Sequence, residues 1–261
     1  MLKPEINAGG DNVEALPQHV FLVMSYSISS DLSCRQSPKV HEAEEAIGNG
    51  QLDPSAVFWE TRQQKIKRQL LWHPADIICV QGVQSIGYNE RCSETHGEWF
   101  SNDEEPVMNH LVHLYRELAM KNYGVAFSPA MKLPGSSSVC LGNAVFWKRS
   151  RWQLKNFWAV PNCAVCTELT SRMQCPDLVV CCSKSPGVYA VEWGEQLDKE
   201  VLLNELAPLQ CQLLQQAAEQ DARPVWCGDF GLPAKDLLEG LAQDWEVQLQ
   251  QSGGVTLNPK P

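Results

Sequence analysis

A short apolar run, DIICVQ at residues 76–81, constrains the fold more than any other feature of the sequence. Every interior position of this run is apolar, which is typical of a strand that is buried on both faces of its sheet. Such a strand needs cover on both sides, from helices or from a second sheet. The run therefore predicts an α/β protein with a layered core.

Helical and strand patterns alternate along the rest of the chain. Helices are predicted over residues 55–72, 107–123, 196–220 and 234–243. Strands are predicted over residues 19–28, 139–147, 163–169, 178–182 and 224–227. Pro208 is expected to kink or split the third helix. We expect a single domain over residues 19–261, after an N-terminal extension at residues 1–18.

The charge balance constrains the partners. The 261 residues include 21 Lys and Arg against 31 Asp and Glu, a formal net charge of −10. An acidic surface repels the phosphate backbone, so RNA binding is possible only through a local basic cluster and is disfavoured. No stretch approaches the roughly 20 apolar residues that cross a bilayer. We expect protein partners and no membrane span.

The cysteines point to a reducing environment. Eleven cysteines without a secretory signal predict thiols and an intracellular compartment, cytoplasmic or organellar. Cys163 and Cys166 form a CxxC pair, but residues three apart in a strand point to opposite faces, so the pair is not expected to bind one metal ion. The neighbours Cys181 and Cys182 are expected to face opposite ways for the same reason.

Five segments, in order, resemble the endonuclease/exonuclease/phosphatase superfamily, nearest to nocturnin and the carbon-catabolite-repressor-type deadenylases. They are FLVMSYSI at 21–28, LDPSAVFWETRQQKIKRQLLWHPADIICVQGVQ at 52–84, GNAVFW at 142–147, LVVCCSK at 178–184 and PVWCGDFGLP at 224–233. The resemblance implies an α/β sandwich of two packed sheets with helices outside. It also implies metal-assisted phosphoester hydrolysis, in which carboxylates and an asparagine hold Mg²⁺.

The positions that carry this chemistry in the family are altered here. An asparagine on the first strand is replaced by Ser27, and the metal-binding glutamate after the second strand is replaced by Gly82. The asparagine, threonine and histidine of the fourth motif match Cys182, Ser183 and Lys184.

The C-terminal motifs are altered as well. Asp229 keeps the aspartate of the fifth motif, but its asparagine is Gly231. The final aspartate–histidine pair is missing, so we expect a C-terminally truncated version of the fold. All six histidines lie at or before residue 113, whereas both histidines of the family's mechanism belong to the second half. We therefore expect no working catalytic site and no bound cofactor, with Asp229 the one ligand left for a residual metal site.

These changes predict a catalytically inactive, structural or adaptor subunit of a larger assembly. One alternative is an active Mg²⁺-dependent 3′-5′ exoribonuclease, deadenylase-like, or a phosphatase that uses spare acids such as Glu192, Glu195 and Asp198. A second alternative is a passive RNA-binding protein. Lys184 is expected to lie close to Asp229, in the place of the lost metal ion. The alternative is that Asp229 caps the helix that begins near Ala234.

Overall fold

The computed structural model describes residues 20–28, 49, 59–101, 109–133, 136, 138–192, 198–233, 235–237 and 239–241. The expected N-terminal extension, the first residues of the helices predicted from 55, 107 and 196, and residues 242–261 lie outside this set. In the helix predicted over 234–243, residues 235–237 and 239–241 are helical.

The first sheet holds the DIICVQ run in β2, one of its interior strands. Its five strands follow the order β1-β2-β5-β4-β3. They are β1 (Val23–Ser27), β2 (Ile77–Ile86), β3 (Arg91–Cys92), β4 (Tyr123–Lys132) and β5 (Val139–Lys148). β1 runs parallel to β2, and the other neighbours are antiparallel. All but the last residue of β2 are buried, which confirms the predicted buried strand.

The second sheet has four strands in the order β6-β7-β8-β9. They are β6 (Trp152–Val160), β7 (Ala164–Ser171), β8 (Leu178–Ser183) and β9 (Arg223–Gly228). β6, β7 and β8 are antiparallel, whereas β9 runs parallel to β8. Each sheet therefore ends in one parallel pair, β1-β2 in the first and β8-β9 in the second.

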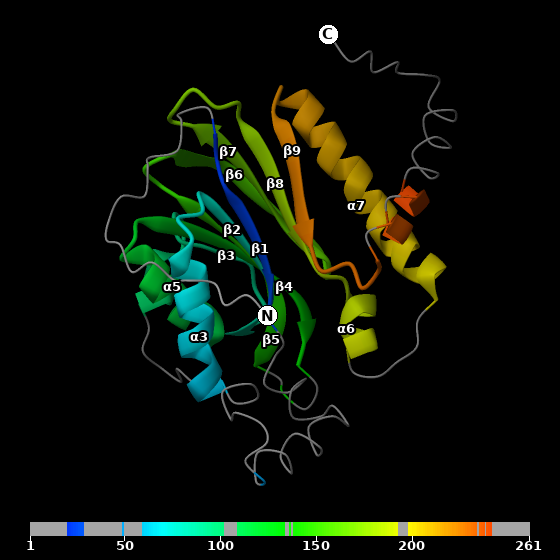
Figure 1. Cartoon of the computed structure of the whole chain (residues 1–261), viewed down its shortest axis with the longest axis horizontal. Helices are drawn as coiled ribbons and strands as arrows, with labels where there is room; N and C mark the ends of the chain where they lie inside the picture. Colours follow the sequence, from blue (N-terminus) through cyan, green and yellow to red (C-terminus); the bar gives the residue numbers. More distant parts are fainter. Residues whose placement is uncertain are drawn as a thin grey trace, which may run out of the picture.

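The elements form four layers, because alternate residues of each strand pack on opposite sides. Helices α3 (Trp59–Trp72) and α5 (His110–Ala119) cover one face of the first sheet, packing against residues such as Ile78 and Val80. Ile77 and Cys79 instead face the second sheet. Helix α7 (Lys199–Glu219) covers the far face of that sheet (Figure 1). This arrangement confirms the predicted two-sheet α/β sandwich.

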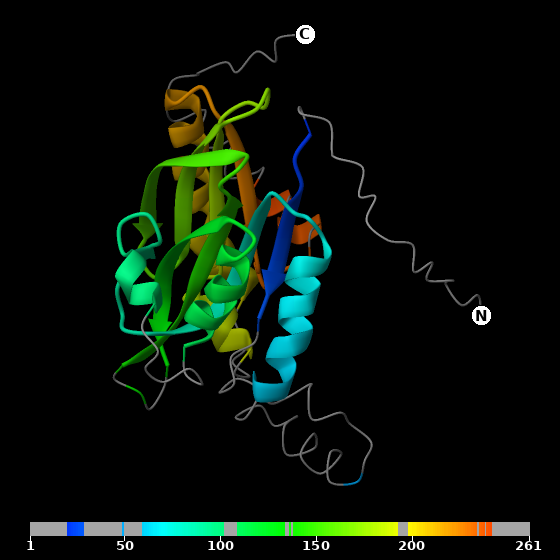
Figure 2. The same cartoon turned by 90° about the vertical axis from the view of Figure 1, so that its left-hand side faces the viewer.

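Two short helices precede the longer ones in the chain. They are α4 (Gly97–Ser101), which precedes α5, and α6 (Pro186–Glu192), which precedes α7. Turned by 90°, the molecule shows β1 between α3 and the strands of the second sheet (Figure 2). Within the described ranges, no helix is long and apolar enough to cross a membrane.

Two details differ from the sequence expectations. Pro208 lies inside α7, which runs without a break from Lys199 to Glu219, so the expected split of the helix is wrong. Cys163 and Cys166 pack into the same apolar cluster beneath α7. Cys163 lies in the turn before β7, next to Asn162 with φ of 59°, so strand alternation does not apply to it.

The alternation expected for Cys181 and Cys182 is confirmed. Cys181 packs toward α7 and Cys182 packs between the sheets, as alternation predicts. The ten cysteines in the described part of the chain are thiols, and seven of them are buried.

Candidate functional site

The two parallel strand pairs end side by side across the sandwich. β1 ends at Ser27, β8 at Ser183 and β9 at Gly228. In Figure 1 the arrowheads of β1 and β9 lie next to each other and point the same way. Polar residues that follow these strands are therefore brought to one place, although Ser27 and Asp229 are 202 positions apart.

A glycine permits the close contact between β8 and β9 at this point. A Cβ atom at Gly228 would lie 2.7 Å from the carbonyl oxygen of Ser183. The backbone of the next residue, Asp229, donates its N–H to that same oxygen at 3.0 Å. The glycine thus lets Asp229 lie directly beside Lys184, which follows Ser183.

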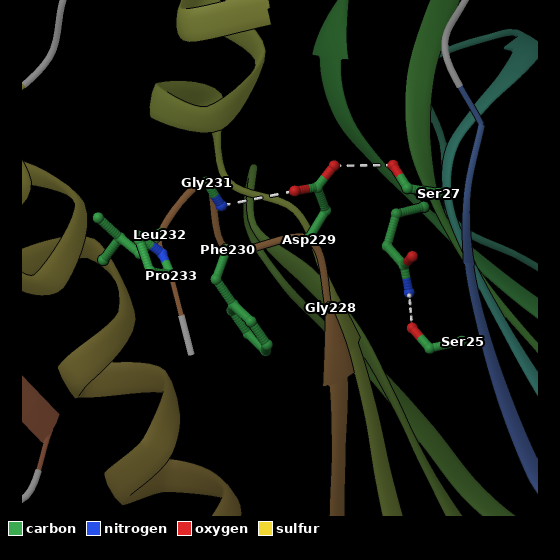
Figure 3. A pocket seen from close by; sticks show the side chains of 9 residues that line it. Ser25, Ser27, Gly228, Asp229, Phe230, Gly231, Leu232 and Pro233 are labelled. Carbon is green, nitrogen blue, oxygen red and sulfur yellow. Dashed lines mark hydrogen bonds between the residues drawn. The ribbon is translucent and has the colours of Figure 1, made fainter. Parts of the chain in front are cut away.

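A cavity of about 470 Å³ opens at these strand ends. One wall is polar and is formed by Ser25, Ser27, Gln81 and Asp229, and the other is formed by Phe230, Leu232 and Pro233 (Figure 3). The cavity is lined by three of the altered family positions that the sequence identified, Ser27, Asp229 and Gly231.

An ion pair between Lys184 and Asp229 lies at the polar wall. The Nζ atom of Lys184 lies 2.9 Å from Oδ2 of Asp229. The Ser27 hydroxyl donates to the same Oδ2 at 2.7 Å (Figure 3). The Lys184 side chain is completely buried, whereas 27% of the Asp229 side chain is exposed. The predicted pairing of Lys184 with Asp229 is confirmed.

Two further contacts hold the Lys184 ammonium in place. Nζ lies 3.4 Å from the Ser27 hydroxyl oxygen. It also lies 4.9 Å from the centre of the Tyr189 ring, within the range of a cation–π contact. Tyr189 belongs to α6 and is itself buried, so the ammonium is enclosed between that helix and the two sheets.

Asp229 is held as a carboxylate. Burial raises the pKa of Asp229. The charge of Lys184 and the hydrogen bonds from Lys184, Ser27 and the Gly231 N–H together lower the pKa by more, so it lies below its ordinary value. The Gly231 N–H donates to Oδ1 at 3.4 Å. These three partners lie outside the described helical residues 235–237 and 239–241, so the contacts do not support the helix-cap alternative.

Gly82 has no space for a side chain. It is the extra residue of a bulge in β2, between Gln81 and Val83, and its φ is +76°. A Cβ atom there would lie 2.1 Å from the carbonyl oxygen of Ile28. The backbone that follows β1 therefore occupies the space into which a side chain at position 82 would extend.

Gln81 was not among the predicted site residues. It is the residue of β2 whose side chain lines the pocket. Its Nε2 donates to the Ser25 hydroxyl at 3.2 Å and to the Cys79 carbonyl at 3.4 Å. Nε2 also lies 3.2 Å from the Cys182 sulfur, which places Cys182 behind the pocket wall, between the sheets. A polar residue at the end of an otherwise apolar strand was the signal that could have identified Gln81.

The spare acids do not add to the pocket. Asp198 precedes α7, is exposed and does not line the cavity. Glu195 and the side chain of Glu192 lie outside the described residues. His96 lies before α4, where its Nδ1 contacts the Cys92 N–H and the Thr95 hydroxyl rather than the pocket.

Comparison with known proteins identifies the fold. No protein-family model matches the chain, and no curated protein matches it by sequence. Among solved structures, ANGEL2, a 2′,3′-cyclic phosphatase, is similar with a TM-score of 0.50 and 18% identity. The match covers 82% of this chain and 54% of the ANGEL2 chain, so this chain spans about half the length of that protein.

The chain has the endonuclease/exonuclease/phosphatase fold. The human Nocturnin catalytic domain is also similar, with a TM-score of 0.48 and 16% identity over 77% of this chain and 64% of that one. An endonuclease/exonuclease/phosphatase family protein from Leptotrichia buccalis C-1013-b matches with a TM-score of 0.46 and 14% identity, over 89% of this chain and 73% of that one.

The residues at this site of the endonuclease/exonuclease/phosphatase fold do not fit Mg²⁺. Mg²⁺ prefers oxygen ligands in octahedral geometry. Asp229 offers a carboxylate, but its Oδ2 is already bound to Lys184 and Ser27. Gly82 offers no ligand, and the described residues contain no group of three or more His, Cys, Asp or Glu side chains placed to hold a metal ion.

Proposed function

We propose that this chain is a noncatalytic protein of the endonuclease/exonuclease/phosphatase fold that serves as a structural or adaptor subunit of a larger assembly. The observation that carries the proposal is the 2.9 Å ion pair between Lys184 and Asp229, with the ammonium fully buried. A cation that belongs to the chain stands beside the carboxylate that would otherwise bind a metal ion.

Electrostatics opposes a metal ion next to this pair. Two unit charges about 4 Å apart interact by roughly 4 kcal/mol at an effective dielectric of about 20, so an ammonium repels a divalent ion by about twice that. The buried Lys184 cannot turn into solvent to relieve the repulsion, because its side chain is enclosed. Metal binding at Asp229 would therefore require the ion pair to break.

Among the described residues, those that line the pocket include no second acid–base group beside Asp229. General acid–base catalysis contributes roughly 10²- to 10⁴-fold in rate and needs a titrating group within hydrogen-bond reach of the substrate. The described lining contains no histidine, and Asp229 is held ionised by its partners. ANGEL2, described as a 2′,3′-cyclic phosphatase, supplies one substrate to test, a 2′,3′-cyclic phosphate.

Two surfaces support a role in an assembly. Among the described strands, β9 pairs only with β8, so its other edge forms no strand pairing within the described part of the chain. The pocket at the strand ends provides a second surface that solvent reaches. The net charge of −10 favours protein partners over nucleic acid.

The catalytic part of the proposal is tested with the purified full chain and Mg²⁺ or Mn²⁺. Substrates are poly(A), RNA with a 2′,3′-cyclic phosphate end, and a chromogenic phosphodiester. We expect rates equal to those of buffer and of the Asp229→Ala variant. Turnover that is abolished by both EDTA and Asp229→Ala would establish the enzyme alternative instead.

The assembly part is tested by affinity purification from native tissue, followed by cross-linking and mass spectrometry. We expect the same protein partners in independent preparations, with cross-links from the β9 edge or the pocket. A monomer that migrates alone by gel filtration of the native extract contradicts the adaptor role.

A further inference from the structure

Three thiols from both sheets meet in the core between them. Cys79 lies on β2 of the first sheet, whereas Cys182 and Cys227 are register partners on β8 and β9 of the second. All three pack into the same apolar cluster between the sheets. The thiol of Cys79 is hydrogen-bonded to those of Cys182 and Cys227. The fold therefore brings cysteines from distant parts of the sequence into direct contact.

Within this group, Cys79 and Cys227 form the pair. The Cys182 sulfur has two other partners, the Nε2 of Gln81 at 3.2 Å and the carbonyl oxygen of Val80 at 3.5 Å. The thiol that Cys227 contacts is that of Cys79. The contact between Cys79 and Cys227 joins the first sheet to the second.

Cys227 gives this group access to solvent. Cys79 and Cys182 are fully buried, whereas Cys227 is partly exposed. Cys227 directly precedes Gly228 and Asp229, which line the cavity at the strand ends (Figure 3). A small oxidant can therefore reach the sulfur of Cys227 and, without help from it, cannot reach that of Cys79.

A second group of thiols lacks this access. Cys163, Cys166 and Cys181 pack together beneath α7, and all three are buried. Buried thiols in apolar surroundings are unreactive, because oxidants and alkylating agents need an accessible sulfur. Contact between thiols is thus common to both groups, and the partly exposed member distinguishes the group of Cys79, Cys182 and Cys227.

We propose that Cys79 and Cys227 form a dithiol that hydrogen peroxide oxidises to a disulfide. The Cys227 sulfur attacks one peroxide oxygen: an S–O bond forms, the O–O bond breaks, and the leaving hydroxide takes the thiol proton as water. The Cys79 sulfur then attacks the Cys227 sulfenic acid: an S–S bond forms, the S–O bond breaks, and a second water leaves with the Cys79 proton. The two thiols lose two electrons, which reduce the peroxide.

The disulfide would lie directly behind the pocket. Disulfides join Cα atoms that are roughly 4.4–6.8 Å apart. Strands β2 and β9 have Cα atoms within 8 Å of each other, so the bond needs only a small approach of the two strands. Gln81 and Asp229 each follow a cysteine of the pair by two positions, and both line the pocket. Oxidation would thus fix the width of the pocket, whether or not the chain is noncatalytic.

The test is oxidation of the reduced full chain with hydrogen peroxide, followed by blocking of the remaining thiols with N-ethylmaleimide. Digestion after glutamate residues leaves Cys79 and Cys227 in separate peptides, each without another cysteine. Mass spectrometry without reduction then identifies linked peptides. We expect the Cys79–Cys227 link to exceed any other by roughly tenfold, and dithiothreitol to remove it, because exchange with an external dithiol reduces an accessible disulfide.

Variants assign the two roles. Cys79→Ala should lose the link and accumulate sulfenic acid at Cys227, which dimedone traps. Label confined to Cys227 also shows that the variant is folded, since an unfolded chain would be labelled at many cysteines. Cys227→Ala should lose the link and leave Cys79 unmodified. The matched control is Cys140→Ala, which removes a buried thiol from the cluster beneath α3 and α5 and should keep the link.

Three results would overturn the inference: a link from Cys227 to Cys182 instead of Cys79, no oxidation of Cys227, or a disulfide between two copies of the chain on a non-reducing gel. The hydrolysis assay is independent of this experiment. Failure of the link leaves the noncatalytic function standing, and metal-dependent turnover leaves the dithiol standing.

Discussion

The ion pair of Lys184 and Asp229 is asymmetric: the lysine side chain is fully enclosed, whereas 27% of the aspartate side chain reaches solvent. The two partners therefore differ in what their loss costs. Removal of the aspartate leaves a charge in the interior, whereas removal of the lysine leaves a charge that water can reach.

Asp229→Ala is expected to destabilise the fold by roughly 3 kcal/mol, the lower end for a broken buried pair because Asp229 is partly exposed. Lys184→Met should destabilise the fold less. The double variant Lys184→Met/Asp229→Ala should recover most of the lost stability, because it leaves no unpaired charge in the interior. Urea denaturation measures all three. Additive losses in the double variant would show that the two side chains do not depend on each other.

Acid should weaken this contribution. Because the pKa of Asp229 in the folded chain lies below its ordinary value, the stabilisation is present above about pH 4, the pKa of an unfolded aspartate, and is lost as the pH falls through the lower folded value. The stability difference between the wild type and Asp229→Asn should be constant from pH 5 to 7 and shrink below it, as chemical denaturation across pH measures. A difference that persists unchanged to pH 2 contradicts this account.

A carboxylate cannot be put back at position 82 without damage. Gly82→Glu and Gly82→Ala should both destabilise the protein, since the new Cβ atom meets the Ile28 carbonyl oxygen at 2.1 Å in a backbone with φ of +76°. The matched control is Gly87→Ala, with φ of +80° but its nearest atom 3.6 Å away. It should cost only about 1–2 kcal/mol for the positive φ.

Thermal melting of the three glycine variants measures these costs, and titration with Mg²⁺ should show no gain of binding in Gly82→Glu. Equal losses at positions 82 and 87 would mean that the contact with Ile28 relaxes freely.

The interior thiols should resist alkylation. Burial raises the pKa of Cys140 to about 12, and burial likewise raises the pKa of Cys163 to about 12, so neither forms much of the reactive thiolate at neutral pH. Cys175 is partly exposed. Iodoacetamide labelling of the native chain, read by peptide mass spectrometry, should modify Cys175 well before the other two. Comparable rates would indicate frequent opening of the core.

The sequence was most informative where one strand or helix could be read locally. The buried run at 77–81 is the first half of β2. The helix predicted over 107–123 is α5, which ends earlier because the chain turns at Asn122 with φ of 63°. Strand β4 was not predicted, since Ser128 and Pro129 interrupt its apolar run. Strand β6 was missed because a bulge between Leu154 and Asn156 breaks its alternation.

Contacts between distant segments at the site could not be read from local sequence patterns. The pairing of Lys184 with Asp229 was predicted from motif positions, which place both residues after strands. The hydrogen bond of Ser27 to Asp229 joins the ends of strands from two different sheets, and no periodicity in the sequence predicts that contact. Gln81 was not predicted because the family motif places its ligand at the next residue, Gly82, whereas the bulge between Gln81 and Val83 leaves Gln81 as the side chain that lines the pocket.

The cation that balances Asp229 is tethered to the backbone of residue 184 and cannot leave by dissociation. A pocket balanced by a diffusible ion changes its occupancy with the ambient concentration of that ion, by mass action. This chain carries its own counter-ion at fixed stoichiometry. The shape that the pocket offers to a partner is thereby uncoupled from fluctuations in the supply of divalent ions.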